Sequence, residues 1–252
     1  MAASKLCDNS VVIQVACTLP YTGFDCYNVN CNCCTYQTSL FSERPTHAPH
    51  LADPNFWKSR YKKDLDSGSL CNFEWMLDYT TLKSHLPSLG DRISVLDLGC
   101  GTSSLLLEFA KDHRLSLACA VDISAEALTI QRQQWEECNC LSQALFVQTS
   151  VLQLPFKERT FDLVLDKGTL DSVIKHSNSQ IAKDYACTLI KESMRILQNS
   201  GIYLQVTDED PELRIPLIEA ALLSKDNRGH SVSYKIIETG SMEYFLYLIS
   251  KS

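Results

Sequence analysis

The stretch that most constrains the fold of this chain is RISVLDLGCGTSSLLLEFAKD, residues 92–112 of 252. An apolar segment containing Ile and Val runs into Asp97, the chain turns at Gly99 and Gly101, and a leucine-rich helical pattern follows. Glycines at such a turn allow positive φ angles and let a ligand approach the main chain. A strand, a glycine turn and a helix in this order are typical of the first unit of a parallel nucleotide-binding sheet.

Beyond this unit, strand-like and helical patterns alternate, which predicts βαβ units around a parallel sheet. The expected elements are a strand at 93–98, a helix near 103–111, a strand at 115–121, a helix near 125–137, strands at 144–148 and 161–165, a helix near 181–197 and a strand at 201–206. The end of the chain differs, because 231–237 and 243–249 are typical of an antiparallel hairpin. The sequence therefore predicts an α/β fold with a Rossmann-like sheet.

The first 50 residues differ from the remainder in composition and in hydrophobic pattern. They carry few charges and little amphipathic period, so we expect 1–50 to lie outside the fold and 51–252 to form one domain. From Leu51 onward, FWKSRY (56–61) and FEWMLDY (73–79) place aromatic residues at helix-like spacing before the first strand.

Charge and hydropathy argue against several classes of function. The formal net charge is −7, whereas nucleic-acid binding needs clustered Lys and Arg, so we expect no nucleic-acid partner. An acidic surface suits a basic protein target better. No run approaches the roughly 18 apolar residues that span a bilayer, so we expect a soluble protein without a membrane partner.

Cysteine and histidine spacing favours free side chains over a metal site. Six of the 12 cysteines lie in the first 34 residues, and CNCC at 31–34 suggests a metal knuckle. No second CxxC or His pair stands at zinc spacing, so free thiols in a reducing compartment are favoured over zinc. The six histidines are interpreted as ordinary surface or loop residues.

The residues around the glycine turn favour a cationic ligand. A dinucleotide site would have a third glycine where Ser104 stands, and the carboxylate of Asp97 would repel a pyrophosphate. Asp122 follows Gly101 by 21 residues and ends the second strand, where a carboxylate accepts hydrogen bonds from both hydroxyls of a ribose. An ammonium at Asp97 and a ribose at Asp122 together describe S-adenosylmethionine. A phosphate or flavin fold is the alternative.

Several motifs carry a resemblance to known enzymes. DLGCGT, VD and the terminal hairpin resemble class I methyltransferases, whose sheet has seven strands. FWKSRY, FEWMLDY, VLDLGCGTSSL, FDLVLDKGTLD and TDEDPELRIP resemble, over about 52–252, a family of protein-lysine methyltransferases that includes enzymes acting on elongation factor 1A. LGCGTSSL, LDKGTLD and DEDPELRIP are most similar to the members that act on mitochondrial citrate synthase. The resemblance implies S-adenosylmethionine as cofactor, citrate synthase as protein substrate and the mitochondrial matrix as location.

Resemblance and turn chemistry together give a set of expected cofactor-binding residues. They are Trp57, Tyr61, Trp75, Asp97, Gly99, Gly101, Asp122, Ile123, Ser150, Val151 and Lys167. The resemblance implies that the three aromatic residues close over the cofactor from the N-terminal side; the alternative is that they form the core of an N-terminal helix. Ser150 stands where relatives carry an acidic residue beside the adenine, so the adenine contact here would come from its hydroxyl or from the backbone of Val151.

Methyl transfer needs a neutral target amine, and two acids are candidates for holding it. An exposed lysine has a pKa near ~10.4, which an apolar aromatic pocket lowers. We predict Asp166 or Asp171 as catalytic residues that orient the amine. The alternatives are that Asp166 ends a strand and caps the next helix, and that Asp171 is a solvated first-turn acid.

The segment TDEDPELR (207–214) follows the fifth strand, at the edge where substrates enter such folds. Asp208 and Glu209 are predicted to contact a basic substrate surface. The same segment predicts a helix start, with Asp210 as N-cap and Pro211 at the first helical position.

Rival functions remain open at this stage. One is a cytosolic methyltransferase of elongation factor 1A, another is a cofactor-binding adaptor that does not catalyse, and a third is a small-molecule methyltransferase. The N-terminal segment matches a mitochondrial transit peptide poorly, because only Lys5 and Arg44 oppose Asp8, Asp25 and Glu43. The oligomeric state is not predicted.

Overall fold

The computed structural model describes residues 11–15, 49–67, 74–138, 143–223, 229–240 and 242–251. Its helices are η1 (Pro49–Ala52), α2 (Pro54–Asp66), α3 (Tyr79–Lys83), α4 (Leu105–Asp112), α5 (Ala125–Glu137), α6 (Thr169–Val173), α7 (Ser179–Ile196) and α8 (Pro211–Leu222). Its strands are β1 (Val11–Val15), β2 (Ile93–Leu98), β3 (Leu115–Asp122), β4 (Ala144–Gln148), β5 (Phe161–Lys167), β6 (Leu197–Thr207), β7 (His230–Thr239) and β8 (Met242–Lys251).

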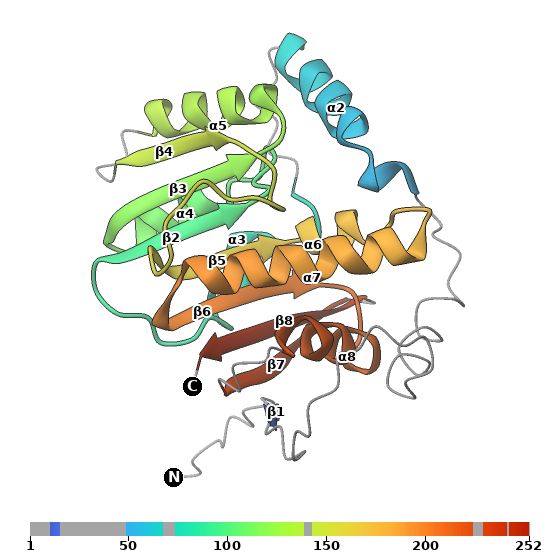
Figure 1. Cartoon of the computed structure of the whole chain (residues 1–252). Helices are drawn as coiled ribbons and strands as arrows, with labels where there is room; N and C mark the ends of the chain where they lie inside the picture. The colour runs from blue at the N-terminus through green and yellow to red at the C-terminus, as the bar shows by residue number, and fades with distance from the viewer. Residues whose placement is uncertain are drawn as a thin grey trace.

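The strands form one mixed sheet in the order β1-β7-β8-β6-β5-β2-β3-β4. The run from β4 to β6 is parallel, and β8 lies antiparallel between β6 and β7. The seven predicted strands and the C-terminal hairpin are therefore confirmed (Figure 1).

An eighth strand comes from the N-terminal segment that was expected to lie outside the fold. Val11–Val15 pairs antiparallel with β7, so this short piece of 1–50 lies on the sheet edge. The remainder up to residue 48, including CNCC, lies outside the described residues, and the domain boundary near residue 50 stays a prediction.

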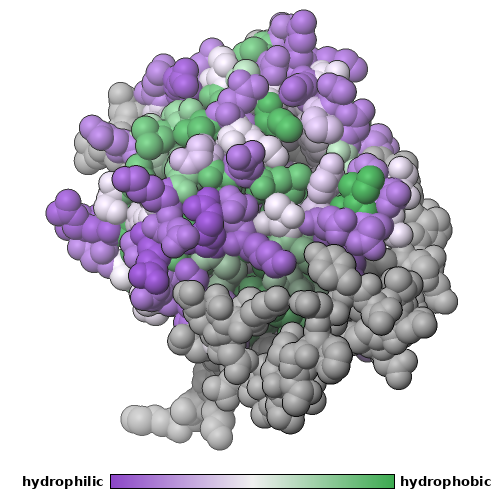
Figure 2. Space-filling model, in the orientation of Figure 1, coloured by the Kyte–Doolittle hydropathy of each residue, from purple (hydrophilic) through white to green (hydrophobic). Residues whose placement is uncertain are grey.

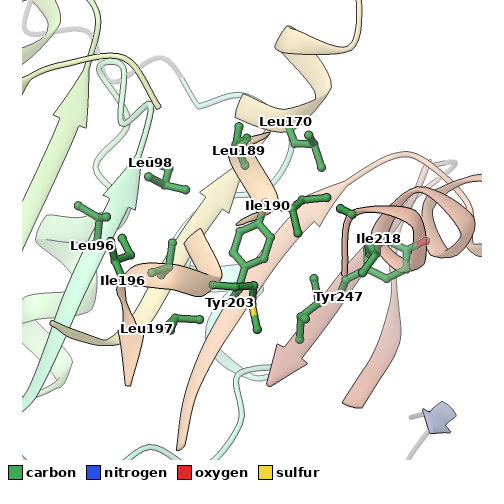
Figure 3. Close-up of a cluster of buried hydrophobic side chains, with 14 of the residues drawn as sticks. Leu96, Leu98, Leu170, Leu189, Ile190, Ile196, Leu197, Tyr203, Ile218 and Tyr247 are labelled. Atoms are coloured by element: carbon green, nitrogen blue, oxygen red, sulfur yellow. The ribbon is translucent and has the colours of Figure 1, made fainter. Parts of the chain in front are cut away.

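Helices cover both faces of the sheet because its central strands are apolar on both faces. Leu96 and Leu98 of β2 pack with α6, α7 and α8, in a cluster that also holds Tyr203 and Tyr247 (Figure 3). Val95 of β2 faces the opposite cluster, which includes residues of α3, α4 and α5. Burying one such leucine stabilises the fold by roughly 1.5–3 kcal/mol, so this two-sided core fixes the strand ends that carry the site.

The local structure departs from expectation at two places. Residues 74–78 are not helical, although the aromatic spacing of 73–79 suggested a helix; Met76 has a φ of 68° and the chain enters α3 only at Tyr79. The short helix α6 was not expected. The start of α8 is confirmed, since the side chain of Asp210 accepts a hydrogen bond from Leu213 N and Pro211 occupies the first turn.

The described part of the surface shown in Figure 2 is mostly hydrophilic. Hydrophilic residues cover most of the described face in Figure 2, and hydrophobic ones form small separate groups there. Within the part of the chain that the structure describes, no helix has the length and apolar character needed to cross a membrane.

Candidate active site

The carboxyl ends of the central strands surround two adjoining cavities. The larger has a volume of about 640 Å³, and the smaller one about 40 Å³. Nine of the predicted cofactor residues line the larger cavity: Trp57, Tyr61, Trp75, Gly99, Asp122, Ile123, Ser150, Val151 and Lys167. Asp97 and Gly101 line the smaller one, which shares the three aromatic residues, Gly99 and Lys167 with its neighbour. The structure thus brings all eleven predicted residues together.

The glycine turn is shaped by packing as well as by φ. Gly99 and Gly101 have φ angles of 60° and 51°. A Cβ atom on Gly101 would lie 2.6 Å from the hydroxyl of Tyr61, and one on Gly99 would overlap the Thr169 hydroxyl. Glycine is therefore needed at both positions to admit side chains of α2 and α6, in addition to any ligand.

Asp122 holds the turn through both of its carboxylate oxygens. Oδ2 accepts a hydrogen bond from Gly101 N at 2.9 Å, and Oδ1 accepts one from Ser124 N at 2.8 Å. Burial raises the pKa of Asp122, and these backbone donors partly oppose that rise. Asp122 lines the larger cavity, and each carboxylate oxygen has capacity for a further hydrogen bond such as one from a ribose hydroxyl.

Asp97 is a buried carboxylate without a cation of its own. It is 3% exposed, and its Oδ2 has no hydrogen-bond partner among the described residues. Burial raises the pKa of Asp97 to about 8; Lys167 opposes the rise, and Glu74, Asp166 and Asp122 add to it. An unpartnered buried carboxylate is costly unless a cation meets it, so this atom fits the ammonium of the cofactor.

Three aromatic rings form one wall of both cavities. The ring centroid of Trp57 lies 5.8 Å from that of Tyr61, with the two rings stacked, and 5.5 Å from that of Trp75. Trp57 Nε1 donates to the carbonyl of Leu51 at 2.7 Å, which fixes the indole over the site. Trp75 comes from the non-helical residues before α3, so the three rings do not form the core of a single N-terminal helix.

Glu74 is a site residue that sequence reasoning missed. Its carboxylate forms an ion pair with Lys167 Nζ at 2.6 Å and accepts hydrogen bonds from Ser103 Oγ at 2.8 Å and Ser104 N at 2.7 Å. Burial raises the pKa of Glu74, but Lys167 and these donors outweigh it and hold the pKa below its usual value. The residue lies inside FEWMLDY, a motif whose pattern is set by its aromatic residues and in which a single acid gives no signal of its own.

The residues that follow β4, Thr149, Ser150 and Val151, line the larger cavity where the sequence predicts adenine. The hydroxyl of Ser150 accepts a hydrogen bond from Leu152 N at 3.2 Å and retains its own proton for donation. His176, interpreted from sequence as an ordinary surface or loop residue, also lines this cavity together with Tyr185. No spacing signal marked it, because α6 was not expected.

Asp166 and Asp171 lie outside the lining of both cavities. Asp166 Oδ1 accepts from Thr169 N at 2.9 Å, and Oδ2 accepts from the hydroxyl of Tyr203 at 2.6 Å, as the helix-capping alternative predicts. Burial raises the pKa of Asp166 to about 6, and the bond from Tyr203 opposes that rise.

Asp171 is not the solvated acid that the alternative reading described. It is 5% exposed and forms an ion pair with Arg214, which is itself fully buried on α8. Thr207 Oγ1 donates to it at 2.8 Å. The acid therefore joins α6 to β6 and α8, and the direct amine contact predicted for it stays untested.

The predicted substrate segment lies just beyond this network. Asp208 is exposed and Glu209 half-buried. The backbone of Glu209 is fixed, because its N–H donates to Thr207 Oγ1 at 3.0 Å and its carbonyl accepts from the hydroxyl of Tyr247 at 2.9 Å. The segment is held at the same sheet edge as the cavities, although neither residue lines them.

Comparison with known proteins gives the family. A family model described as a methyltransferase domain matches residues 89–246. The citrate synthase-lysine N-methyltransferase of Danio rerio, described as mitochondrial, is 29% identical over 85% of this chain and 89% of the relative. That of Pongo abelii is 30% identical over 80% and 88%. EEF1A lysine methyltransferase 4 of Mus musculus is 28% identical over 68% and 69%.

A solved structure supports the fold. The crystal structure of a SAM-dependent methyltransferase from Aquifex aeolicus has a TM-score of 0.51 at 17% identity, with 78% of this chain and 98% of that chain covered. The fold and the paired cavities thus define a methyltransferase with S-adenosylmethionine as its cofactor. Within that class, the chain belongs to the family of protein-lysine methyltransferases, which act on a protein substrate.

Proposed function

We propose that this enzyme methylates a lysine side chain of citrate synthase in the mitochondrial matrix. The relatives in Danio rerio and Pongo abelii, each aligned over at least 80% of this chain, carry that activity and the word mitochondrial in their names. The observation that carries the chemistry is Asp97, a buried carboxylate with an unpartnered oxygen, which lines the small cavity of about 40 Å³ that adjoins the cavity of about 640 Å³.

The residues present fit the cofactor. Asp97 would take the ammonium, the backbone at Gly99 would admit the methionine end, and Asp122 would accept from the ribose hydroxyls. Ser150 and Val151 would flank the adenine. When bound, S-adenosylmethionine would supply a methyl group on a sulfonium, with the neutral thioether as the leaving group when the target amine displaces it in line.

The protein must present a neutral amine to that methyl group. The rings of Trp57, Tyr61 and Trp75 exclude water, and an apolar wall of this kind lowers the pKa of a lysine that enters it. Burial raises the pKa of Tyr61 well above its usual value, so its hydroxyl stays neutral. Near-attack alignment within about 3–3.5 Å then depends on how rigidly the cavity walls are held.

Asp166 and Asp171 support this geometry from outside the cavity. Asp166 caps the start of α6, and Asp171 joins α6 to Arg214; α6 in turn contributes Thr169, Ser172 and Val173 to the cavity wall. We therefore assign both acids to orienting the amine through the wall that they hold. An Asp166→Asn variant with full turnover would remove that residue from the proposal.

The test is methyl transfer to purified proteins. The full chain and an Asp97→Asn variant are incubated with methyl-labelled S-adenosylmethionine and either citrate synthase or elongation factor 1A, and mass spectrometry locates the label. Label on one citrate synthase lysine that depends on Asp97 is the expected result. Label on elongation factor 1A alone would keep the chemistry and replace the substrate. The similarity to EEF1A lysine methyltransferase 4 of Mus musculus makes this the second candidate.

The proposed mitochondrial location has its own test. The full chain fused at its C-terminus to a fluorescent protein is expected to colocalise with a matrix marker. A diffuse cytosolic signal would contradict the mitochondrial address without affecting the assignment of the cofactor site.

A further inference from the structure

A buried lysine lies beside the carboxylate of Asp97 and is engaged elsewhere. Lys167 has a side chain only 5% exposed, and its charge lowers the pKa of Asp97 against the larger effect of burial. Its Nζ nevertheless bonds Glu74 at 2.6 Å and the carbonyl of Trp75 at 3.0 Å. Among the described residues, Asp97 forms no ion pair with it.

Glu74 is fixed in place by the start of α4. Ser103 Oγ, Ser104 N and Ser104 Oγ donate to its carboxylate at 2.8, 2.7 and 3.0 Å. The side chain of Ser104 makes no capping bond to α4. Glu74 thus provides, from a distant segment of the chain, the hydrogen-bond acceptor at the start of α4. The same bonds hold its carboxylate in place, so that it cannot easily move with Lys167.

We propose that Glu74 is a positioning residue that holds Lys167 away from Asp97 and so leaves the Asp97 carboxylate free for the cofactor's ammonium. The inference rests on the proposed placement of the cofactor's amino-acid end at Asp97. Without the charge of Glu74, the Lys167 ammonium would pair with Asp97, because both are buried and no other partner of equal charge is offered. The cofactor would then compete with an internal cation for its own site.

Other charged groups around Asp97 cannot take the place of Lys167. Glu74, Asp166 and Asp122 are acids that raise the pKa of Asp97, and the thiols of Cys100 and Cys119 are neutral because burial raises their pKa values. Lys167 is the cation that acts on Asp97 in the described part of the chain. The partner that holds Lys167 therefore determines whether Asp97 is available to an ammonium group.

A double-mutant cycle in cofactor binding tests the proposal. S-adenosylmethionine is titrated by calorimetry into the full chain, Glu74→Gln, Lys167→Met and the double variant. We expect Glu74→Gln to weaken binding by about tenfold when Lys167 is present, and by less than about twofold in the Lys167→Met background. Glu74→Asp, which keeps the charge, is expected to retain most of the affinity.

Equal weakening in both backgrounds would overturn the proposal, because Glu74 would then act only as a support for α4. Unchanged binding by Glu74→Gln would overturn it as well. Asp112→Asn is the matched control: it breaks a 2.5 Å ion pair with Lys83 at the other end of α4 and should leave the Kd unchanged. Tight binding by Asp97→Asn would show instead that the cofactor placement itself is wrong.

Discussion

Two buried acids near the carboxyl ends of β2 and β5 differ in whether a cation pairs with them, although each has one carboxylate oxygen without a hydrogen-bond partner among the described residues. Asp97, at the end of β2, has a pKa raised to about 8 and forms no ion pair with any described residue. Asp171, on α6 after β5, has the guanidinium of Arg214 and the hydroxyl of Thr207 against it. A buried acid that an internal cation meets holds its elements together, whereas Asp97, which has no such cation, is available to a cationic ligand.

The same contrast explains the positions of the two acids. Asp97 faces the cavity that the aromatic wall closes, and Asp171 lies behind the cavity wall, between α6 and α8. With the proposed cofactor placement, dissociation of the cofactor would remove the partner of the first acid in each catalytic cycle. Removing the partner of the second should damage the fold.

The largest effect is expected from breaking the matched pair. Arg214→Met leaves Asp171 buried without its cation, and loss of one member of such a pair costs about 3–5 kcal/mol. Urea unfolding at pH 7.5 measures the free energy of unfolding. The double variant Arg214→Met with Asp171→Asn should recover part of that loss; a loss below about 1 kcal/mol in the single variant would make the two acids equivalent.

Neutralising Asp97 should raise the free energy of unfolding, whereas Arg214→Met should lower it. The folded-state pKa of Asp97 is raised, so its ionisation costs stability as pH rises from about 4, its unfolded value, to about 8, where the cost is complete. Cofactor-free Asp97→Asn should therefore be more stable than the parent chain by about 2–4 kcal/mol at pH 8.5 and nearly equal at pH 4. Destabilisation at pH 8.5 would contradict the unmatched state of Asp97.

The pH dependence of cofactor affinity should reflect the titration of Asp97. The ammonium binds the ionised form of Asp97, so the association constant should fall about tenfold per pH unit below pH 7. Above about pH 8 it should fall again, because a free α-amino group loses its proton there. Calorimetry across pH 6–9 checks this profile. In Asp97→Asn the acid-side fall should vanish, and its persistence would assign it to another group.

The smallest effect is expected at the two acids just before α8, which line neither cavity. Reversing charge at the exposed Asp208 and the half-buried Glu209 should raise KM for the protein substrate by about threefold, with kcat and cofactor Kd little changed, because charges at the surface steer association more than they add affinity. Steady-state kinetics against citrate synthase at two salt concentrations measures it. An unchanged KM would leave the segment only its helix-capping role.

The sheet and the acids and glycines of its first turns could be predicted because their signals are local, whereas Trp57, Tyr61, Trp75 and Lys167 were expected only from the family resemblance. The apolar run into Asp97, the two glycines and the acid at Asp122 lie where one βαβ unit must place them. Glu74 and Arg214 could not be found in this way, since their partners lie far off in the chain: Lys167 is 93 residues from Glu74, and Asp171 is 43 residues from Arg214. Pairing across such separations depends on tertiary packing that periodicity does not encode.

The first measurement is a calorimetric titration of S-adenosylmethionine into the full chain and into Asp97→Asn at pH 8. The account predicts measurable one-site binding by the parent chain, weakened at least about a hundredfold in the variant, since a buried charge pair is lost. Equal binding by both proteins would contradict the claim that the unmatched carboxylate of Asp97 makes this fold a cofactor site.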